Sequence, residues 1–158
     1  MKLTIERAIL LKALGHVHSV VERRNTIPIL SNVKFDADDG AVRLNATDMD
    51  IDIIEEVVAN VSTPGGTTVS VHTLYDIVRK LPEGAQVDID GDGSGQMTLS
   101  AGRSRFSLAS LPVNEFPVLS GGDFPHQFPV TAHDLRGLVD RTRFAISTEE
   151  TRYYLNGI

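Results

Sequence analysis

The stretch Ile5-Glu6-Arg7-Ala8-Ile9-Leu10-Leu11-Lys12-Ala13-Leu14 recurs twice in altered form along the chain. It returns as Val69-Ser70-Val71-His72-Thr73-Leu74-Tyr75-Asp76-Ile77-Val78 and again as Val130-Thr131-Ala132-His133-Asp134-Leu135-Arg136-Gly137-Leu138-Val139. The three copies align without a gap, and in each a short β-rich run leads into a helix with one apolar face. Recurrence at this spacing is typical of a duplicated supersecondary unit, so we expect the fold to be organised around it.

The first copy predicts one strand, one helix and three further strands. Residues 1–6 alternate apolar and polar side chains, as in a half-buried strand. The helix that follows places Leu10, Leu14, Val17 and Val21 on its apolar face and Lys12, His16, Ser19 and Arg23 on the opposite face. A loop at Pro28 ends this segment. Strands are then predicted at 29–36, 41–47 and 49–61.

The second copy repeats this order. A strand at 67–71 leads into a helix whose buried side chains are Leu74, Ile77, Val78 and Leu81, and Pro82 ends it. Strands follow at 86–90, 96–101 and 103–110. Two βαβββ units predict an α+β domain over residues 1–119, with its helices on one side of the sheets. From about residue 111, a run rich in proline, glycine and bulky apolar residues predicts an extended linker.

The third copy begins a second domain at residues 120–158. Residues 128–131 are predicted as a strand, and Thr131-Ala132-His133-Asp134 matches the capping-box pattern of a helix start. Leu135, Leu138, Val139 and Thr142 form the apolar face of that helix. Residues 152–158 occupy the place of the next strand, where the sequence ends, so we expect a truncated view of a longer protein.

Composition restricts the class of protein. Of 158 residues, 41% are hydrophobic and 23% are charged, and no apolar run approaches the ~20 residues that span a bilayer. The absence of cysteine and of an apolar leader favours the cytoplasm. A net charge of -6 argues against a surface that holds nucleic acid by bulk electrostatics.

Two acidic segments invite a metal-binding interpretation. Asp88 to Leu99 opens like an EF-hand loop, but Leu99 stands where the motif requires a bidentate glutamate, so a glycine-rich hairpin turn is favoured. Asp48, Asp50 and Asp52 are expected to share one strand face and to be capable of holding a divalent metal. A metal-dependent enzyme that uses this strand is therefore one alternative hypothesis, and a solvated acidic face is the favoured one.

Catalytic motifs are lacking: the sequence has no cysteine, no Gly-x-Ser-x-Gly elbow and no Walker A loop, and its five histidines are scattered. We predict no enzyme activity and no cofactor. Basic residues on the polar helix faces are a better indication of function, because helices on one side of a sheet would bring these residues to one surface that could contact DNA. They are Lys12, His16, Arg23, Arg79, Lys80, Arg136 and Arg143, with Arg24 on the adjoining loop. An ordinary DNA-binding module is the second alternative.

Several motifs, taken in order, carry a family resemblance. They are Arg24-Asn25-Thr26-Ile27-Pro28-Ile29-Leu30, Ala46-Thr47-Asp48-Met49-Asp50, Leu81-Pro82-Glu83-Gly84-Ala85, Gly102-Arg103-Ser104-Arg105-Phe106-Ser107-Leu108, Leu111-Pro112-Val113-Asn114-Glu115-Phe116-Pro117 and Arg152-Tyr153-Tyr154-Leu155-Asn156-Gly157. With these motifs the whole chain resembles the bacterial β sliding clamps, non-catalytic processivity subunits of the DNA-directed DNA polymerase III holoenzyme, a nucleotidyltransferase.

The resemblance implies a homodimeric ring of three-domain subunits, with helices lining a channel around duplex DNA. Such a ring holds DNA topologically, so an acidic exterior is compatible with DNA binding. The implied partners are the polymerase alpha subunit, the clamp loader and repair proteins, all of which dock through short linear motifs.

The resemblance also implies roles for particular residues. Arg24, Tyr153 and Tyr154 would contact DNA, with weaker expectations for Arg79 and Lys80 and for His72 and Glu149, which stand where family members carry Arg and Gln. Arg103, Arg105, Phe106 and Leu108 would form the subunit interface. Arg152, Tyr154 and Leu155 would form part of the cleft for partner peptides.

Overall fold

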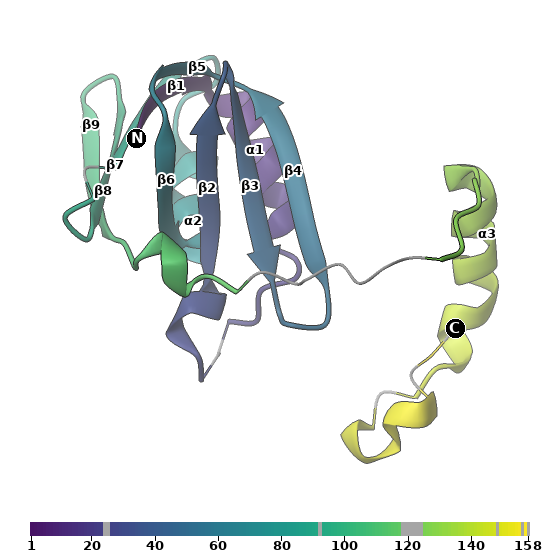
Figure 1. Cartoon of the computed structure of the whole chain (residues 1–158). Coiled ribbons are helices and arrows are strands. Elements are labelled where there is room, and N and C mark those ends of the chain that lie inside the picture. The colour runs from purple at the N-terminus through teal and green to yellow at the C-terminus, as the bar shows by residue number, and fades with distance from the viewer. Residues whose placement is uncertain (24–25, 92, 118–124, 148, 156, 158) are drawn as a thin grey trace. The chain divides into compact units, whose positions relative to one another are not determined.

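The computed structural model (Figure 1) describes residues 1–23, 26–91, 93–117, 125–147, 149–155 and 157. The chain divides into two compact units, Met1–Leu119 and Ser120–Ile158, which are described separately here. Among the described residues, no helix is both long and apolar enough to cross a bilayer.

The first unit contains nine strands and two α-helices within the described residues. In chain order they are β1 (Lys2–Glu6), α1 (Arg7–Val17), β2 (Asn32–Asp38), β3 (Ala41–Thr47), β4 (Asp52–Val58), β5 (Asn60–Thr63), β6 (Gly65–Ser70), α2 (Val71–Lys80), β7 (Gln86–Gly91), β8 (Gln96–Ala101) and β9 (Ser104–Ala109). Short 3₁₀ helices lie at Pro28–Ser31 and Val113–Glu115. The α+β class is therefore confirmed. The second copy has the predicted βαβββ order, and the first copy has one strand more.

The strands form two sheets. Their orders are β5-β1-β7-β8-β9 and β4-β3-β2-β6. The two βαβββ copies within the first unit exchange their first strands, because β1 of the first copy pairs with β7 of the second copy, and β6 of the second copy pairs with β2 of the first copy. Neither βαβββ unit can complete its sheet alone, which explains why the two copies form one domain.

One hydrophobic core joins both sheets and both helices. It includes Leu10 and Leu14 from α1, Leu74 from α2, Phe35 from β2 and Leu99 from β8, all fully buried. Both helices lie on the same side of the β4-β3-β2-β6 sheet (Figure 1). The prediction that the helices share one side is confirmed, and their polar faces are left for solvent.

The helix starts fall at equivalent positions of the three copies, and in the second copy the helix begins at the last residue of the strand predicted at 67–71. The helices begin at Arg7, Val71 and Ala132, which occupy the same aligned position in the three copies. The end of α1 differs from the prediction, since the helix stops at Val17 rather than continuing to Arg23. Val21 is buried nonetheless, so the apolar periodicity continued past the helix into a turn.

Two predicted strands of the first unit are also corrected. The strand predicted at 29–36 begins only at Asn32, because Pro28 starts a 3₁₀ helix that is favoured by its fixed φ. The strand predicted at 49–61 is divided into β4 and β5, and these belong to different sheets. Ala59 lies between them and donates its N–H to the carbonyl of Gly40.

The second unit contains α3 (Ala132–Thr142) and two 3₁₀ helices, Arg143–Ala145 and Glu150–Leu155. The helix start predicted by the capping-box pattern is confirmed. The Thr131 hydroxyl accepts the Asp134 N–H at 3.1 Å as an N-cap and donates to the Asp134 carboxylate at 2.7 Å. The strands predicted at 128–131 and 152–158 are wrong: the first is extended without a partner strand among the described residues, and the described part of the second is mainly 3₁₀ helix.

Candidate nucleic-acid interface

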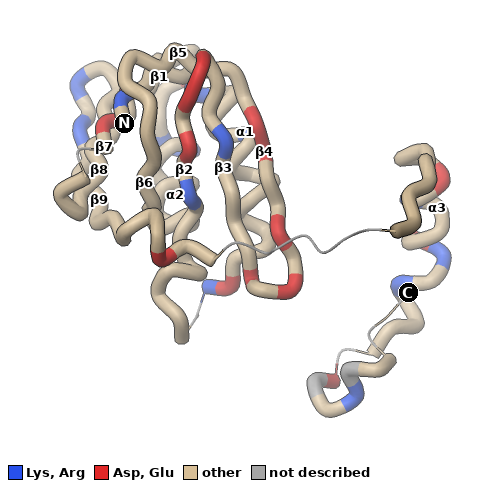
Figure 2. The backbone as a smooth tube through the Cα atoms, in the orientation of Figure 1, with Lys and Arg blue, Asp and Glu red and all other residues tan. Residues whose placement is uncertain are grey.

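In the first unit, the helical layer, which is α1 and α2, is mainly basic, and the sheet formed by β4, β3, β2 and β6 is mainly acidic. The helices α1 and α2 carry four basic residues and one acidic residue, whereas residues 32–58 of β2, β3 and β4 carry two basic and eight acidic residues. Figure 2 shows the acidic positions along β2, β4 and the turn between β3 and β4. The helical layer is therefore the part of this unit that is suited to a polyanion.

On the helical layer, the cationic side chains differ in what they contact. Lys12 and Lys80 are exposed, and Arg79 forms an ion pair of 3.2 Å with Asp76. His16 lies 3.2 Å from Glu55 on β4, so its ring faces the edge of the sheet. Arg23 is exposed beyond α1. Of the predicted basic surface, the first unit therefore contributes mainly Lys12, Lys80 and Arg79, whereas Arg136 and Arg143 belong to the second unit.

Arg7 is a structural residue that the sequence reasoning missed. Its guanidinium donates to the carbonyl oxygens of Val78 at 3.1 Å and Arg79 at 2.7 Å, at the end of α2. Those carbonyls belong to the last turn of α2, where carbonyls lack the usual helical partners, although the Val78 carbonyl also accepts the Leu81 N–H at 3.3 Å. Arg7 therefore joins the start of α1 to the end of α2. An arginine at the first helical position of one copy was the available signal.

His72 lies toward the interior rather than toward solvent. Its Nε2 donates to the carbonyl of Val21 at 2.8 Å, and its Nδ1 is buried with no partner among the described residues. The geometry therefore gives His72 a packing contact between α2 and the turn after α1.

The residues expected at a subunit interface lie on both faces of the edge strand β9. Phe106 and Leu108 are half-buried against the core and lie opposite Leu99 and Met97. Phe106 also lines a cleft of about 380 Å³ with Ile77, Leu81 and Pro82. Arg105 lies on the other face, where it lines a polar groove with Lys2 and Asp88. Arg103 precedes the strand and is exposed.

The acidic strand face is not the arrangement that the sequence predicted. Asp48 and Asp50 lie in the tight turn before β4, where the Asp48 carboxylate accepts the N–H groups of Asp50 and Ile51 at 2.9 and 2.7 Å. Only Asp52 belongs to the strand. Within the described parts of the chain, no three His, Asp or Glu side chains are arranged to hold a metal ion.

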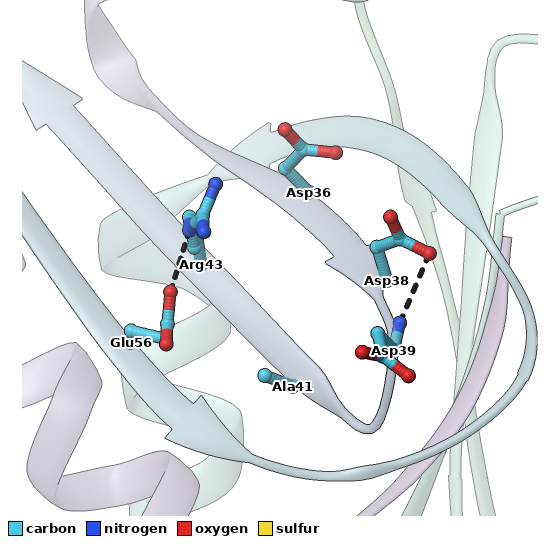
Figure 3. Close-up of a pocket in the computed structure, with 6 residues that line it drawn as sticks. All are labelled: Asp36, Asp38, Asp39, Ala41, Arg43 and Glu56. Atoms are coloured by element: carbon cyan, nitrogen blue, oxygen red, sulfur yellow. Dashed lines mark hydrogen bonds and ion pairs between the residues drawn. The ribbon is translucent and has the colours of Figure 1, made fainter.

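A hollow of about 280 Å³ on the outer face of the same sheet gathers further acids (Figure 3). It is lined by Asp36, Asp38, Asp39, Ala41, Arg43 and Glu56. Arg43 donates to Glu56 at 2.6 Å, and this bond with the Glu56 charge raises the pKa of the guanidinium above its ordinary value. The pair is exposed, so it adds little stability.

The segment that resembles an EF-hand loop is a β-hairpin. It runs from β7 to β8, and Asp92 lies outside the described residues. Asp88 accepts a hydrogen bond of 2.6 Å from the Thr4 hydroxyl, and Asp90 pairs with Lys2 at 3.0 Å. Both carboxylates are therefore used within the sheet.

The remaining predicted site residues either lie outside the described residues or belong to the second unit. Arg24 lies outside the described residues, as does the side chain of Tyr153. In the second unit, Arg152 pairs with Glu149 at 3.0 Å, and Tyr154 and Leu155 are exposed by 70% and 48%. The turn Glu150–Leu155 therefore brings three predicted residues, Glu149, Arg152 and Tyr154, onto one short segment.

Comparisons with known proteins agree with this architecture. Residues 1–120 match the family described as the N-terminal domain of the DNA polymerase III beta subunit. The Beta sliding clamp of Caulobacter vibrioides is 56% identical over 159 aligned positions, and that of Escherichia coli K12 is 37% identical. Each alignment covers 100% of this chain and 43% of the relative, so the chain spans about two-fifths of those proteins.

Solved structures give the same result. A Caulobacter crescentus pol III beta structure matches with a TM-score of 0.94 and 56% sequence identity. The match covers 99% of this chain and 42% of the Caulobacter chain. The sliding clamp of Bartonella birtlesii bound to griselimycin has a TM-score of 0.96 at 49% identity, with 100% and 42% covered. The family match and these likenesses together establish that the chain belongs to the DNA polymerase III beta subunit, or β sliding clamp, family.

Proposed function

We propose that this chain is the N-terminal part of a non-catalytic cytoplasmic clamp that encircles duplex DNA and tethers the replicative polymerase. The observation that carries the proposal is the charge sorting of the first unit. A basic helical layer opposite an acidic sheet supports weak contact with phosphates on one side only. Contacts to phosphates that do not read bases allow a ring to slide along DNA.

The DNA-facing surface is assigned first to Lys12, Arg79 and Lys80 on α1 and α2, which are exposed. Arg24, Tyr153, Tyr154 and Glu149 are assigned to it by family resemblance alone. His72 is given a supporting role, because its Nε2 is bonded to the Val21 carbonyl. The basic layer is modest, so we expect a short residence at any one position and strong dependence on salt.

The subunit interface is assigned to the edge strand β9. Its outer backbone edge has no partner strand among the described residues, and Phe106 and Leu108 are only half-buried beside it. An edge strand with partly exposed apolar side chains is suited to pairing with another chain. Arg103 and Arg105 would meet acidic groups of the second subunit in a homodimeric ring.

The cleft for partner peptides is assigned in part to Arg152, Tyr154 and Leu155. Their exposure makes them accessible to a linear motif. The peptides expected are those of the polymerase alpha subunit, the clamp loader and repair proteins. This assignment rests on the family resemblance of the motif Arg152-Tyr153-Tyr154-Leu155.

The two alternative functions are disfavoured for different reasons. The metal-dependent enzyme required three carboxylates on one strand face, and Asp48 instead caps a turn. An ordinary DNA-binding module would be expected to carry a net positive charge, whereas this chain carries -6.

Primer extension tests the proposal. The full-length protein is added, with the clamp loader and the replicative polymerase, to a primed single-stranded circle under single-hit conditions. We expect products many times longer than with polymerase alone, because a tethered polymerase reassociates before it diffuses away. Product lengths that do not change on adding the protein would contradict the proposed function.

A further inference from the structure

Three aromatic rings pack together where α1 ends beside α2. The His18 ring stacks on the Tyr75 ring, with centroids 4.3 Å apart and 16° between the planes. His18 also meets His72 edge-on, with centroids 5.8 Å apart. We call His18, His72 and Tyr75 the ring stack. Stacked and edge-on pairs at these separations are favourable aromatic geometries.

The backbone holds both imidazole rings of the stack. His18 Nδ1 lies 3.0 Å from the Gly15 carbonyl, and His72 Nε2 lies 2.8 Å from the Val21 carbonyl. A carbonyl oxygen only accepts, so each of these nitrogens is the donor. The ring stack is therefore fixed to the end of α1 and to the turn after it, and it presents one Tyr75 face in a defined orientation.

Arg79 lies against this fixed surface. His72, Tyr75 and Arg79 are spaced i, i+3 and i+7, which places them on one face of α2. The guanidinium carbon of Arg79 is 5.8 Å from the Tyr75 ring centroid, and Nη2 is 3.2 Å from the Asp76 carboxylate. The Arg79 side chain is nevertheless 56% exposed. It is a restrained cation with one side open to solvent.

The other exposed cations of the layer have no comparable restraint. Among the described residues, the side chains of Lys12 and Lys80 form no ion pair or ring contact. Each must lose its rotamer freedom when it binds a phosphate. An arginine that is already ordered loses less, and its planar fork matches two phosphate oxygens.

We propose that the ring stack positions Arg79 as the main phosphate contact of the α1–α2 layer. In this arrangement, Tyr75 and His18 are positioning residues that strengthen DNA binding through Arg79 without touching DNA. The inference rests on the proposed function, because it needs duplex DNA beside the helices. Asp76 offsets part of the Arg79 charge, which keeps the contact weak enough for sliding.

The test measures affinity of the full-length protein for a short duplex with open ends, which can enter a ring without a loader. Fluorescence anisotropy gives Kd at several salt concentrations. Arg79→Gln should weaken binding and reduce the slope of log affinity against log salt by about 0.9, the value for one lost phosphate contact. Tyr75→Leu should weaken binding about threefold with the slope retained, because the cation remains but is no longer ordered.

A double-mutant cycle isolates the positioning role. If Tyr75 acts only through Arg79, then Tyr75→Leu should have no further effect on Kd in the Arg79→Gln background. Lys80→Gln is the matched control, and there Tyr75→Leu should keep its full threefold effect. Tyr75→Phe keeps the ring and should bind like the wild type. An equal loss from Tyr75→Leu in all three backgrounds would overturn the inference, as would an unchanged Kd in Arg79→Gln.

Two further measurements separate the possible failures. Melting temperatures identify any variant that does not fold, and His18→Ala, which removes the stacking partner, then replaces Tyr75→Leu in the same cycle. If the wild type is retained equally on circular and linear DNA, the proposed function fails. If the wild type shows topological retention and Arg79→Gln binds normally, only the role of the ring stack fails.

Discussion

Arg7 Nη2 donates a hydrogen bond of 2.7 Å to the carbonyl oxygen of Arg79, which lies 72 residues later in the chain. A second bond of 3.1 Å joins Arg7 Nε to the Val78 carbonyl. The negative end of the α2 dipole therefore receives a positive charge from the first residue of α1. This contact sets the relative position of the two helices that bear the basic layer.

Replacing Arg7 should destabilise the first unit. Arg7→Met removes both bonds to the end of α2 and should lower the free energy of unfolding by about 2 kcal/mol, as measured by urea denaturation. Arg7→Lys keeps the charge but cannot span both carbonyls in the same geometry, so it should recover only part of the loss. Full stability in both variants would contradict the helix-joining role.

A buried threonine should hold the chain after β9 against the β4-β3-β2-β6 sheet. The Thr68 hydroxyl accepts from Asn32 Nδ2 at 3.0 Å and from Leu111 N at 3.1 Å, and it donates to the Leu111 carbonyl at 2.8 Å. Thr68→Val leaves Asn32 Nδ2 and Leu111 N without this acceptor and should cost about 3 kcal/mol of stability. Hydrogen exchange at 111–116 should accelerate.

Thr68→Ser provides the matched control for that variant. It keeps the hydroxyl and should leave the exchange rates of residues 111–116 close to those of the wild type. Equal protection of this segment in Thr68→Val and Thr68→Ser would show that the hydroxyl does not hold it.

The turn before β4 carries backbone strain at Met49, whose φ is +81°. Glycine adopts this conformation without a steric cost, so Met49→Gly should raise the free energy of unfolding by up to about 1 kcal/mol. Asp48→Ala should lower it by about 1 kcal/mol, because two N–H groups lose their acceptor. Opposite shifts in the denaturation midpoint are expected, and a destabilised Met49→Gly protein would refute the assignment of strain.

Phe106→Ala should act on association of the full-length protein more than on its fold. The side chain is only half-buried on an edge strand, so dimerisation should weaken by at least about tenfold, as expected for an apolar interface residue. Ser62→Ala, on β5 at the opposite edge of the same sheet, is the control and should dimerise normally. Analytical ultracentrifugation measures both, and a Phe106→Ala protein with wild-type association would remove β9 from the proposed interface.

Patterns that are local in the sequence predicted the fold well. The helices start at Arg7, Val71 and Ala132, which are equivalent positions of the gapless alignment, and the capping-box pattern marks the third start. Strand β3 matches its predicted bounds, because alternation of apolar residues marks it clearly. The exchange of first strands was not predicted, because pairing between distant segments leaves no local periodicity.

The candidate site was predicted less completely for the same reason. Arg7 was missed because its acceptors lie at the end of α2, and His72 was expected to face DNA although its hydrogen bond to Val21 turns it inward. The acidic run at Asp48 was interpreted as a strand, whereas its side chain caps a turn. In each case the missing information was the identity of a backbone partner.

Topological retention tests the central claim most directly. The full-length protein is loaded on a nicked circular plasmid by its clamp loader and washed at a salt concentration that disrupts ordinary phosphate contacts. Half of the sample is then linearised. The account predicts that the protein stays on the circle and is lost from the linear DNA by sliding off its ends. Equal retention on both DNAs would contradict encirclement and would return the basic helical layer to the role of a conventional binding surface.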